Sequence, residues 1–274
     1  MKKILGAIAA LAMTVGLAAC GTPVSQGTAN QNQLVVGMEA GYPPFNWTQK
    51  DDSNGAVKIQ GTDQYAGGYD VEIAKRVAKQ LGKELVIVKT EWDGLTPAVV
   101  SGKIDAIIAG MSPTEERKAT IDFTDSYYDS QLVLVVKKGS KYANATSLAD
   151  FAGAKVTAQL NTFHYSVIDQ ITGVDKQAAM DNFPAMRVAL QSGTIDAYVS
   201  ELPEAISAQA ANSDFVMVKL TDGFKTSPED TQTAVGVKKD SPLTKEINEA
   251  LKTISSEERQ QIMQEAIKNQ PAAE

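Results

Sequence analysis

The sequence predicts an α/β fold built from two similar lobes, and two observations support this prediction. Short apolar runs with the composition of buried strands alternate with segments whose apolar residues recur at helical spacing, which is typical of parallel sheets covered by helices. The pattern Gly-Lys-Ile-Asp-Ala at 102–106 returns as Gly-Thr-Ile-Asp-Ala at 193–197. The repeat indicates that both lobes are built alike.

The N-terminal residues have the pattern of an export signal. An apolar segment, 4–15, follows two lysines and is too short to span a bilayer as a mature helix, but it suits a signal peptide over residues 1–19. Residues 17–21, Leu-Ala-Ala-Cys-Gly, resemble a bacterial lipobox, in which Cys20 becomes the lipid-modified first residue. A diacylglyceryl group supplies two acyl chains, as stable anchoring requires. We therefore expect a lipoprotein anchored on the extracytoplasmic face of the cell membrane.

Composition narrows the range of partners and chemistries. The chain has 26 Lys and Arg and 33 Asp and Glu residues. Removal of residues 1–19 takes away two lysines, so 24 basic against 33 acidic side chains give a net charge near −9. This excess of negative charge argues against a nucleic-acid partner. Cys20 is the only cysteine, so its lipidation would leave no thiol for a disulfide, a nucleophile or a metal ligand.

The first lobe is expected to begin after a flexible tether. Residues 20–33 are rich in Gly, Ser, Thr, Gln and Asn and lack apolar periodicity. A strand at 34–38 then leads into a loop, 39–47, in which two prolines fix the backbone beside a carboxylate and several aromatic rings, as in a pocket wall. Phe45 and Trp47 are assigned to the core. The later elements are a surface hairpin within 48–66, a helix at 69–82, a strand at 83–89, a helix at 92–102 and a strand at 104–109.

Polar and aromatic residues follow several of these strands. The carboxyl ends of parallel strands meet at one edge of a sheet, where open α/β sheets bind ligands. Glu39 and Tyr42 follow the first strand, Trp92 follows the second, and the turn 110–117 follows the third. We therefore expect these residues to line one cleft.

The turn 110–117, Gly-Met-Ser-Pro-Thr-Glu-Glu-Arg, carries the clearest binding signal. Ser112 with a glutamate three residues later fits a capping box, and Pro113 then occupies the first helical position. The free N–H groups of that first turn, the hydroxyls of Ser112 and Thr114 and the guanidinium of Arg117 could converge on one small anion. A carboxylate fits best, because arginine presents a planar fork of donors. On spacing alone, an ordinary capped helix with a solvated arginine is equally compatible.

Several motifs occur in the order and spacing of one known family. They are Gly41-Tyr42-Pro43-Pro44-Phe45, Gly68-Tyr69-Asp70-Val71-Glu72, Trp92-Asp93-Gly94-Leu95, Ser101-Gly102-Lys103-Ile104-Asp105-Ala106, Ser112-x-Thr114-x-x-Arg117 and Asp122-Phe123-Thr124. From about 34 to 267 the chain resembles the polar amino-acid-binding family of ABC-transporter solute-binding proteins, family 3 of the bacterial extracellular solute-binding proteins. The resemblance implies a two-lobed periplasmic-binding-protein-like fold of type II, with a ligand cleft between lobes joined by two hinge strands. It implies that lobe 1 spans 34–128 and 232–274 and lobe 2 spans 129–231.

In the second lobe the resemblance points to further binding positions. Where the family usually has Gly-Thr and a small polar residue, this chain has Asn161-Thr162-Phe163; Thr162 is retained, whereas Phe163 departs from the pattern and could form a pocket wall. Glu201 matches the position of an Asp that pairs with the ligand α-ammonium. His164, the only histidine, opens a helix after a strand and could touch the ligand, but a surface or capping role is favoured. Other expected elements are strands at 132–138, 155–160, 215–220 and 233–238, a capped turn at 147–153, a helix within 178–192 and two C-terminal helices that pack back on lobe 1.

An amino acid offers three handles, and the chain has groups for each. The expected ligand-binding residues are Arg117, Ser112, Thr114 and Thr162 beside Gly110 for the carboxylate, Glu201 for the ammonium, and Glu39, Tyr42 and Trp92 for the side chain. Because the lobes contribute from opposite sides, a ligand would favour a closed state of the protein. The chain would bend at two hinge strands, near 129–131 and 225–232. A membrane ABC permease would recognise that state. The protein is expected to act as a monomer without cofactor or metal.

The identity of the amino acid is left partly open by the sequence. An acidic Glu39 and the aromatic faces at 42 and 92 suit a cation, which favours a ligand of the lysine or arginine type. Glutamine-binding members of the family also carry an acid there, so glutamine is an alternative. An enzyme on the same fold, such as a dehydratase using His164, Glu39 or Glu201, and a sensor module are two further classes. No Ser-His-Asp order, H-E-x-x-H or phosphate loop supports an enzyme, so we expect none.

Overall fold

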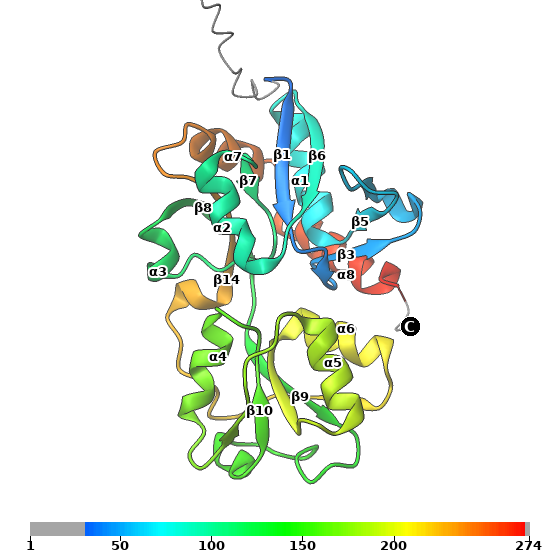
Figure 1. Ribbon diagram of the computed structural model, residues 1–274, viewed down its shortest axis with the longest axis vertical. Coiled ribbons are helices and arrows are strands. Elements are labelled where there is room, and N and C mark those ends of the chain that lie inside the picture. Colours follow the sequence, from blue (N-terminus) through cyan, green and yellow to red (C-terminus); the bar gives the residue numbers. More distant parts are fainter. Residues whose placement is uncertain (1–30, 272–274) are drawn as a thin grey trace, which may run out of the picture. The chain divides into compact units, whose positions relative to one another are not determined.

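The computed structural model describes residues 31–271, and Figure 1 shows that they form two lobes, one of them containing β1 and β6 and the other β9 and β10. The predicted signal peptide, Cys20 and nearly all of the predicted tether lie outside the described residues. Among residues 31–271 no helix is both long and apolar enough to cross a membrane. The predicted α/β architecture with two lobes is confirmed. We call residues 31–128 and 232–271 lobe 1 and residues 129–231 lobe 2.

Lobe 1 is built on a five-stranded sheet in the order β6-β1-β7-β14-β8. Strand β1 is parallel to both of its neighbours, β6 and β7, and β14 is antiparallel to β7 and β8. The strands are β1 Gln33–Met38, β6 Glu84–Lys89, β7 Ala106–Ile107, β8 Ile121–Asp129 and β14 Gln232–Lys238. The helices are α1 Tyr69–Gln80, α2 Trp92–Ser101, α3 Glu115–Lys118, α7 Leu243–Lys252 and α8 Ser256–Asn269.

Helix α1 shows how the apolar pattern positions these elements. Its buried aliphatic residues are Val71, Ile73, Ala74, Val77 and Ala78, the stripe that the helical spacing predicts. Removing side chains such as these from water contributes roughly 1.5–3 kcal/mol for each Val or Ile. The helix ends where the sequence predicts, because Gly82 follows it with φ of 63°, a left-handed conformation that favours glycine. The sheet and its helices thereby fix the loops at the carboxyl ends of the strands.

Lobe 2 repeats the arrangement with the order β11-β10-β12-β9-β13. Strand β10 is parallel to both neighbours, and β9 is antiparallel to β12 and β13, as β14 is to its neighbours in lobe 1. The strands are β9 Leu132–Lys137, β10 Lys155–Thr157, β11 Asp175–Lys176, β12 Ala197–Glu201 and β13 Phe215–Val218. The helical segments are η2 Leu148–Phe151, α4 Phe163–Val167, η3 Ile168–Gln170, α5 Phe183–Ser192, α6 Leu202–Ala211 and η4 Pro228–Thr231.

The repeated Gly-x-Ile-Asp-Ala pattern has the same structural role in both lobes. Gly102 and Gly193 end α2 and α5 in left-handed conformations, with φ of 76° and 78°. The Asp105 carboxylate accepts a hydrogen bond from the backbone N–H of Val35 at 2.8 Å. Asp196 accepts the equivalent bond from Lys155 at 2.9 Å. Each aspartate thus ties the strand it precedes to the start of the neighbouring parallel strand, which explains why the pattern occurs twice.

The segment between β1 and α1 forms more than the predicted surface hairpin. A small antiparallel sheet has the order β2-β3-β5-β4, with β2 Gly41–Tyr42, β3 Asn46–Gln49, β4 Val57–Lys58 and β5 Tyr65–Gly67, and with η1 Ser53–Gly55 between β3 and β4. Strand β2 and the first half of β3 lie in the predicted pocket loop, 39–47. The hairpin predicted within 48–66 is therefore part of the same small sheet as that loop. Phe45 and Trp47 are 0% and 5% exposed, so their assignment to the core is confirmed.

The chain crosses between the lobes twice, and the two crossings lie side by side. Ser130 follows β8 and leads into β9, whereas Thr231 leads back into β14 (Figure 1). The backbone N–H of Ser130 donates to the carbonyl of Thr231 at 2.8 Å, and Asp129 pairs with Gln232. These crossings coincide with the predicted hinge segments. A third link joins α8 to α6, where Gln270 Nε2 donates to the carbonyl of Ser207 at 3.1 Å.

Candidate functional site

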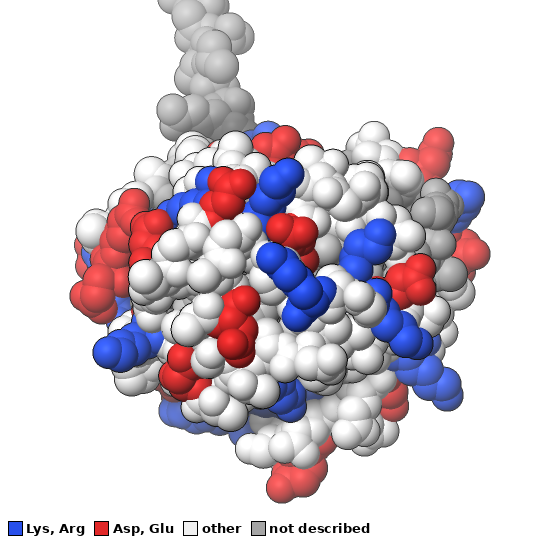
Figure 2. Space-filling model, turned by 90° about the horizontal axis from the view of Figure 1, so that it is seen from below, with Lys and Arg blue, Asp and Glu red and all other residues white. Residues whose placement is uncertain are grey.

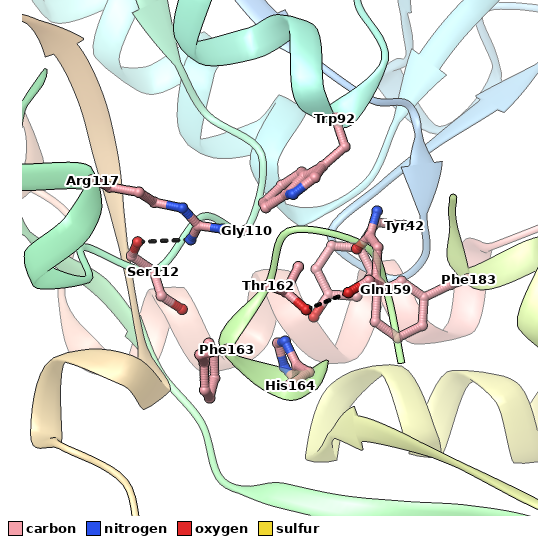
Figure 3. A pocket seen from close by; sticks show the side chains of 10 residues that line it. All are labelled: Tyr42, Trp92, Gly110, Ser112, Arg117, Gln159, Thr162, Phe163, His164 and Phe183. Carbon is pink, nitrogen blue, oxygen red and sulfur yellow. Dashed lines mark hydrogen bonds between the residues drawn. The ribbon is translucent and has the colours of Figure 1, made fainter. Parts of the chain in front are cut away.

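A pocket lies between the lobes, at the edges where the parallel strands end. The space among its lining residues, counted together with space open to solvent, is about 260 Å³. Both lobes contribute to it (Figure 3). The lining residues are Tyr42, Trp92, Gly110, Ser112 and Arg117 from lobe 1 and Gln159, Thr162, Phe163, His164 and Phe183 from lobe 2. Thus six of the nine residues predicted to bind ligand line one pocket: Tyr42, Trp92, Gly110, Ser112, Arg117 and Thr162.

The predicted helix cap in the turn 110–117 is wrong by two residues. Helix α3 begins at Glu115, and its N-cap is Thr114, whose Oγ1 accepts a hydrogen bond from the N–H of Arg117 at 3.4 Å. Ser112 does not cap the helix because its hydroxyl instead donates to the carbonyl of Asp230 at 2.8 Å, on the return crossing. This long-range bond could not be deduced from local spacing. Pro113 therefore precedes the helix.

Arg117 carries a positive charge that makes no ion pair within the described residues, although the carboxylates of Glu116 and Asp230 are near enough to act on it. Its Nη1 donates to the carbonyl of Ser112 at 3.0 Å and its Nη2 donates to the carbonyl of Asn161, in lobe 2, at 3.1 Å. The guanidinium carbon lies 5.1 Å from the centre of the Trp92 ring. Within residues 31–271 no carboxylate lies at ion-pair distance from it. Burial lowers the pKa of Arg117 to about 10, so it stays protonated at neutral pH.

Glu201 supplies the opposite charge from lobe 2. It is the last residue of β12 and is 1% exposed. Its Oε1 lies 3.3 Å from Nε2 of His164, but neither group makes a hydrogen bond of acceptable angle. The surface or capping role predicted for His164 is wrong: the side chain is buried, lines the pocket and faces this carboxylate. In helix α4, which begins at Phe163, the side chain of His164 points into the protein. The helix has only five residues, too few for an apolar pattern in the sequence to predict which side is buried.

Tyr42 lies between the two lobes and packs against aromatic residues of both. Its ring stacks on Phe45 with centroids 4.8 Å apart and on Phe183 of α5 with centroids 4.4 Å apart. Burial, and next the charge of Glu201, raise the pKa of Tyr42 well above its usual value, so its hydroxyl is neutral. In this structure Trp92 is paired with the Arg117 guanidinium. The sandwich of a ligand side chain by Tyr42 and Trp92 therefore stays a prediction.

Glu39 makes a hydrogen bond from lobe 1 to lobe 2. Its two carboxylate oxygens accept from Nε2 of Gln159 at 3.3 and 3.2 Å, and the same amide donates to the carbonyl of Asp181 at 3.0 Å. Glu39 is 5% exposed, and desolvation raises its pKa to about 7 although the Gln159 bond opposes the shift. Glu39 is thus close to the pocket through Gln159, which lines it. Sequence reasoning did not single out Gln159, although it follows β10 as Glu39 follows β1.

Gly110 and Thr162 shape the pocket with groups that are already bonded. Gly110 has φ of 63°, and a Cβ there would lie 2.7 Å from the Tyr42 ring. Its N–H donates to the hydroxyl of Tyr127 at 3.1 Å, and that hydroxyl donates to Asp70 at 2.8 Å. The hydroxyl of Thr162 donates to the carbonyl of Gln159 at 2.7 Å (Figure 3). These bonds fix the backbone of both site loops.

Asn161 departs from the glycine that the family resemblance predicts, and its geometry shows why asparagine is accepted. Its φ is 54°, in the left-handed region that favours glycine and, next, asparagine. Its side chain donates to Oδ1 of Asp93, in lobe 1, at 2.8 Å. Asn161 therefore contacts lobe 1 through its amide and through its carbonyl, which accepts from Arg117.

No group of three or more His, Cys, Asp or Glu side chains among residues 31–271 is arranged to hold a metal ion. The pocket is lined by Arg117, and the buried carboxylate of Glu201 lies 3.3 Å from another lining residue, His164. This arrangement can hold a small molecule that carries both an anionic and a cationic group.

The fold and the site together define a two-lobed binding protein for a small molecule. The chain belongs to the bacterial extracellular solute-binding proteins, family 3, whose family model matches residues 34–269. The type II periplasmic-binding-protein fold predicted from the sequence is thereby confirmed.

Individual relatives are similar over nearly the full chain. The chain is 30% identical to the arginine-binding extracellular protein ArtP of Bacillus subtilis over 254 residues, which cover 92% of each chain. It is 32% identical to the glutamine-binding protein GlnH of the same organism, covering 99% of this chain and 100% of that one. A solved amino-acid ABC transporter substrate-binding protein from Streptococcus pneumoniae, bound to L-arginine, has a TM-score of 0.74 and 28% identity, covering 87% of this chain and 95% of that one.

Proposed function

We propose that this protein captures a polar L-amino acid, of the basic lysine or arginine type, and delivers it to an ABC permease. One observation carries the proposal. Arg117 on lobe 1 lines the pocket, and Glu201 on lobe 2 lies 3.3 Å from His164, which lines it too; the two carry opposite charges, and neither has an Asp, Glu, Lys or Arg ion-pair partner among the described residues. A zwitterion would supply both missing partners.

The α-carboxylate would bind on the lobe 1 side. Arginine has five N–H donors, and Arg117 uses two of them on carbonyl groups, so others are available for a bidentate bond to a carboxylate. Ser112 and Thr114 would act mainly by holding the turn, because their hydroxyls are already bonded to Asp230 and to the helix start. Thr162 would present the N-terminal turn of α4 in the same way. Trp92 would keep the guanidinium plane fixed.

The preference for a basic side chain rests on Glu39. A cation near Glu39 would compensate a carboxylate that burial now disfavours, since burial raises its pKa to about 7. The aromatic faces nearby would add about 0.5–2 kcal/mol for a cation. Glutamine is the alternative, because a protonated or ionised Glu39 can also bond an amide, and relatives that are named for arginine and for glutamine are both similar to this chain.

Ligand binding would favour closure of the lobes about the two crossings. The pocket is formed by both lobes, so only the closed form completes the contacts, and the permease would recognise that form. A lipid on Cys20 would keep the protein near the membrane. On the face seen in Figure 2, acidic and basic side chains are interspersed, which gives no continuous basic area there for nucleic acid.

A thermal-shift screen against the twenty amino acids with ornithine, citrulline and cystine tests the proposal. A ligand at a hundred times its dissociation constant adds about 2.7 kcal/mol to the free energy of unfolding, so it raises the midpoint visibly. Shifts confined to lysine, arginine and ornithine, and weakened in Glu39→Gln, are expected. A shift with glutamine alone would remove the role given to Glu39. No shift with any of them would favour an enzyme, tested by turnover of prephenate or arogenate, or a sensor.

A further inference from the structure

Three buried polar side chains at the pocket lack the hydrogen bonds that burial normally requires. They are the hydroxyl of Tyr42, both ring nitrogens of His164 and both carboxylate oxygens of Glu201. Their exposed fractions are 4%, 7% and 1%, so solvent does not satisfy them. Buried polar groups are paired in the great majority of cases, and an unpaired one calls for an explanation. His164 and Glu201 lie 3.3 Å apart, and Tyr42 lines the same pocket as His164.

Among the described residues, His164 is the only basic side chain at ion-pair distance from Glu201. The next carboxylate along the chain, Glu204, is neutralised by Arg187 at 2.8 Å. Asp70 is held by Asn46 at 2.7 Å and by Tyr127. No lysine or arginine among residues 31–271 is within ion-pair distance of Glu201, whereas Nε2 of His164 is 3.3 Å from its Oε1. An ionised buried carboxylate is stable only beside a positive charge or several donors.

We propose that His164 is the resident counter-ion of Glu201 and that the ammonium group of the ligand takes over this role. The inference rests on the proposed function, because it concerns the same ammonium position. One buried carboxylate neutralises one positive charge, and a second cation beside it is uncompensated. When the ammonium reaches Glu201, the imidazolium therefore loses one proton to solvent and stays as a neutral ring. The ligand keeps its three ammonium protons, and no other bond changes.

The surroundings of His164 contain no other group that would absorb this charge. Phe163, whose ring centroid is 4.2 Å away, is apolar. From β12 the facing group is Glu201 itself, and from β2 it is Tyr42, which lies beside Glu201 and whose pKa is raised by burial and by that carboxylate, so that it stays neutral. Asp169, on the helical segment after α4, is paired with Lys176 at 2.9 Å. Asp70, whose pKa is raised to about 7 by burial and also by Glu201, titrates in the same range, so the contribution of His164 has to be isolated by removing the imidazole.

The consequence is that acid weakens ligand binding through His164. Below neutral pH the ligand has to displace a proton as well as water, so the dissociation constant rises by at most about tenfold per pH unit for one proton released. Glu39 also titrates in this range, with a pKa of about 7, and it can release a proton to a cationic ligand. The informative quantity is therefore the difference between the wild-type protein and a variant that lacks the imidazole.

Isothermal titration tests this difference with the amino acid that gives the largest thermal shift. Titrations at about pH 6 and about pH 8, each in two buffers of different ionisation enthalpy, count the protons released per ligand. We expect His164→Asn to release measurably fewer protons than the wild type at about pH 6 and the same number at about pH 8. Ser166→Ala, on the exposed side of α4, should match the wild type. Equal proton counts in His164→Asn and the wild type at both pH values would overturn the proposal.

A second measurement needs no ligand and separates this inference from the proposed function. His164 is the only histidine, so ¹⁵N NMR of protein without a histidine tag reports one imidazole. In Glu201→Gln at about pH 6, without ligand, the signals should move towards those of neutral imidazole, because the counter-ion is gone. Unchanged signals would overturn the pairing even if amino acids bind. Shifted signals in a protein that binds no amino acid would support the pairing and reject the proposed function.

Discussion

Lobe 1 and lobe 2 have sheets of the same strand order, but the residues that follow equivalent strands differ in charge. Arg117 lies in the helix that follows β7, and Glu201 is the last residue of the equivalent strand β12. After β1 it presents the acid Glu39, and after the equivalent β10 the amide of Gln159, which bonds to it. The structural aspartates of the Gly-x-Ile-Asp-Ala repeat are unchanged. The comparison teaches that the two lobes share one arrangement of strands. The side chains at their facing edges, in contrast, are complementary: a positive charge in one lobe corresponds to a negative charge in the other, and an acid to an amide that bonds to it.

The largest effect is expected from removing the positive charge of lobe 1. Arg117→Ala should weaken amino-acid binding by about 10²- to 10⁴-fold, because loss of one partner from a buried charge pair costs about 3–5 kcal/mol. Arg117→Lys keeps the charge but loses the planar fork of donors, so its affinity for the amino acid should lie between those of the wild type and Arg117→Ala. Isothermal titration measures both. The neighbouring Lys118→Ala is the control, because the side chain of Lys118 forms an ion pair with Glu115 at the surface. An equal loss of affinity in Lys118→Ala would contradict the assignment of Arg117 to the carboxylate site.

The acid that faces Gln159 should make stability depend on pH. Desolvation raises the pKa of Glu39 from 4.5 to about 7, so between these values the folded state binds more protons than the unfolded state. The stability of the wild-type protein should therefore fall as pH rises from about 4.5 to about 7. Glu39→Gln should flatten this decline by up to roughly 3 kcal/mol. Urea unfolding at several pH values measures it, and an identical slope in the variant would show that Glu39 is not the group responsible.

The repeated aspartates offer a direct test of equivalence between the lobes. Asp105→Ala and Asp196→Ala should each lower the free energy of unfolding by about 1–2 kcal/mol, since each removes a charged acceptor from a strand-starting N–H. Chemical denaturation of the two variants should give similar losses. Asp63→Ala, which removes an exposed carboxylate 3.8 Å from Lys58, should cost less than about 0.5 kcal/mol. Clearly unequal losses in the two aspartate variants would break the comparison.

The smallest effect is expected at the contact between α8 and α6. Gln270→Ala removes two hydrogen bonds to Ser207 and should cost about 0.5–1.5 kcal/mol. Its specific signature should be faster amide exchange in α6, the helix of lobe 2 that it touches. Gln261→Ala, on an exposed part of α8, is the control. Unaltered exchange in α6 would mean that the contact does not stabilise lobe 2.

The elements that could be predicted are those that local patterns determine. The apolar stripe of α1, the alternation of strands and helices and the repeated Gly-x-Ile-Asp-Ala pattern were sufficient for the fold. Arg117 was predicted from the turn that follows a strand and Glu201 from the family resemblance, and their contacts with a ligand stay predictions. The cap at Thr114, the burial of His164 and the roles of Gln159 and Phe183 were missed. Each depends on a partner distant in sequence, such as Asp230 for Ser112 or Tyr42 for Phe183, and no periodicity records such partners.

The paired crossings have a mechanical consequence. The two crossing segments lie side by side and are joined by the hydrogen bond from Ser130 to Thr231. Two segments joined in this way would bend together as a hinge, but they would resist sliding past one another and stretching. Lobe 2 would therefore swing about one axis and return along the same arc. Residues far from that axis, such as Gln159, would travel further than Ser112, which is tied to the return crossing by its bond to Asp230. The carboxylate end of the pocket would remain nearly stationary while the opposite end opens.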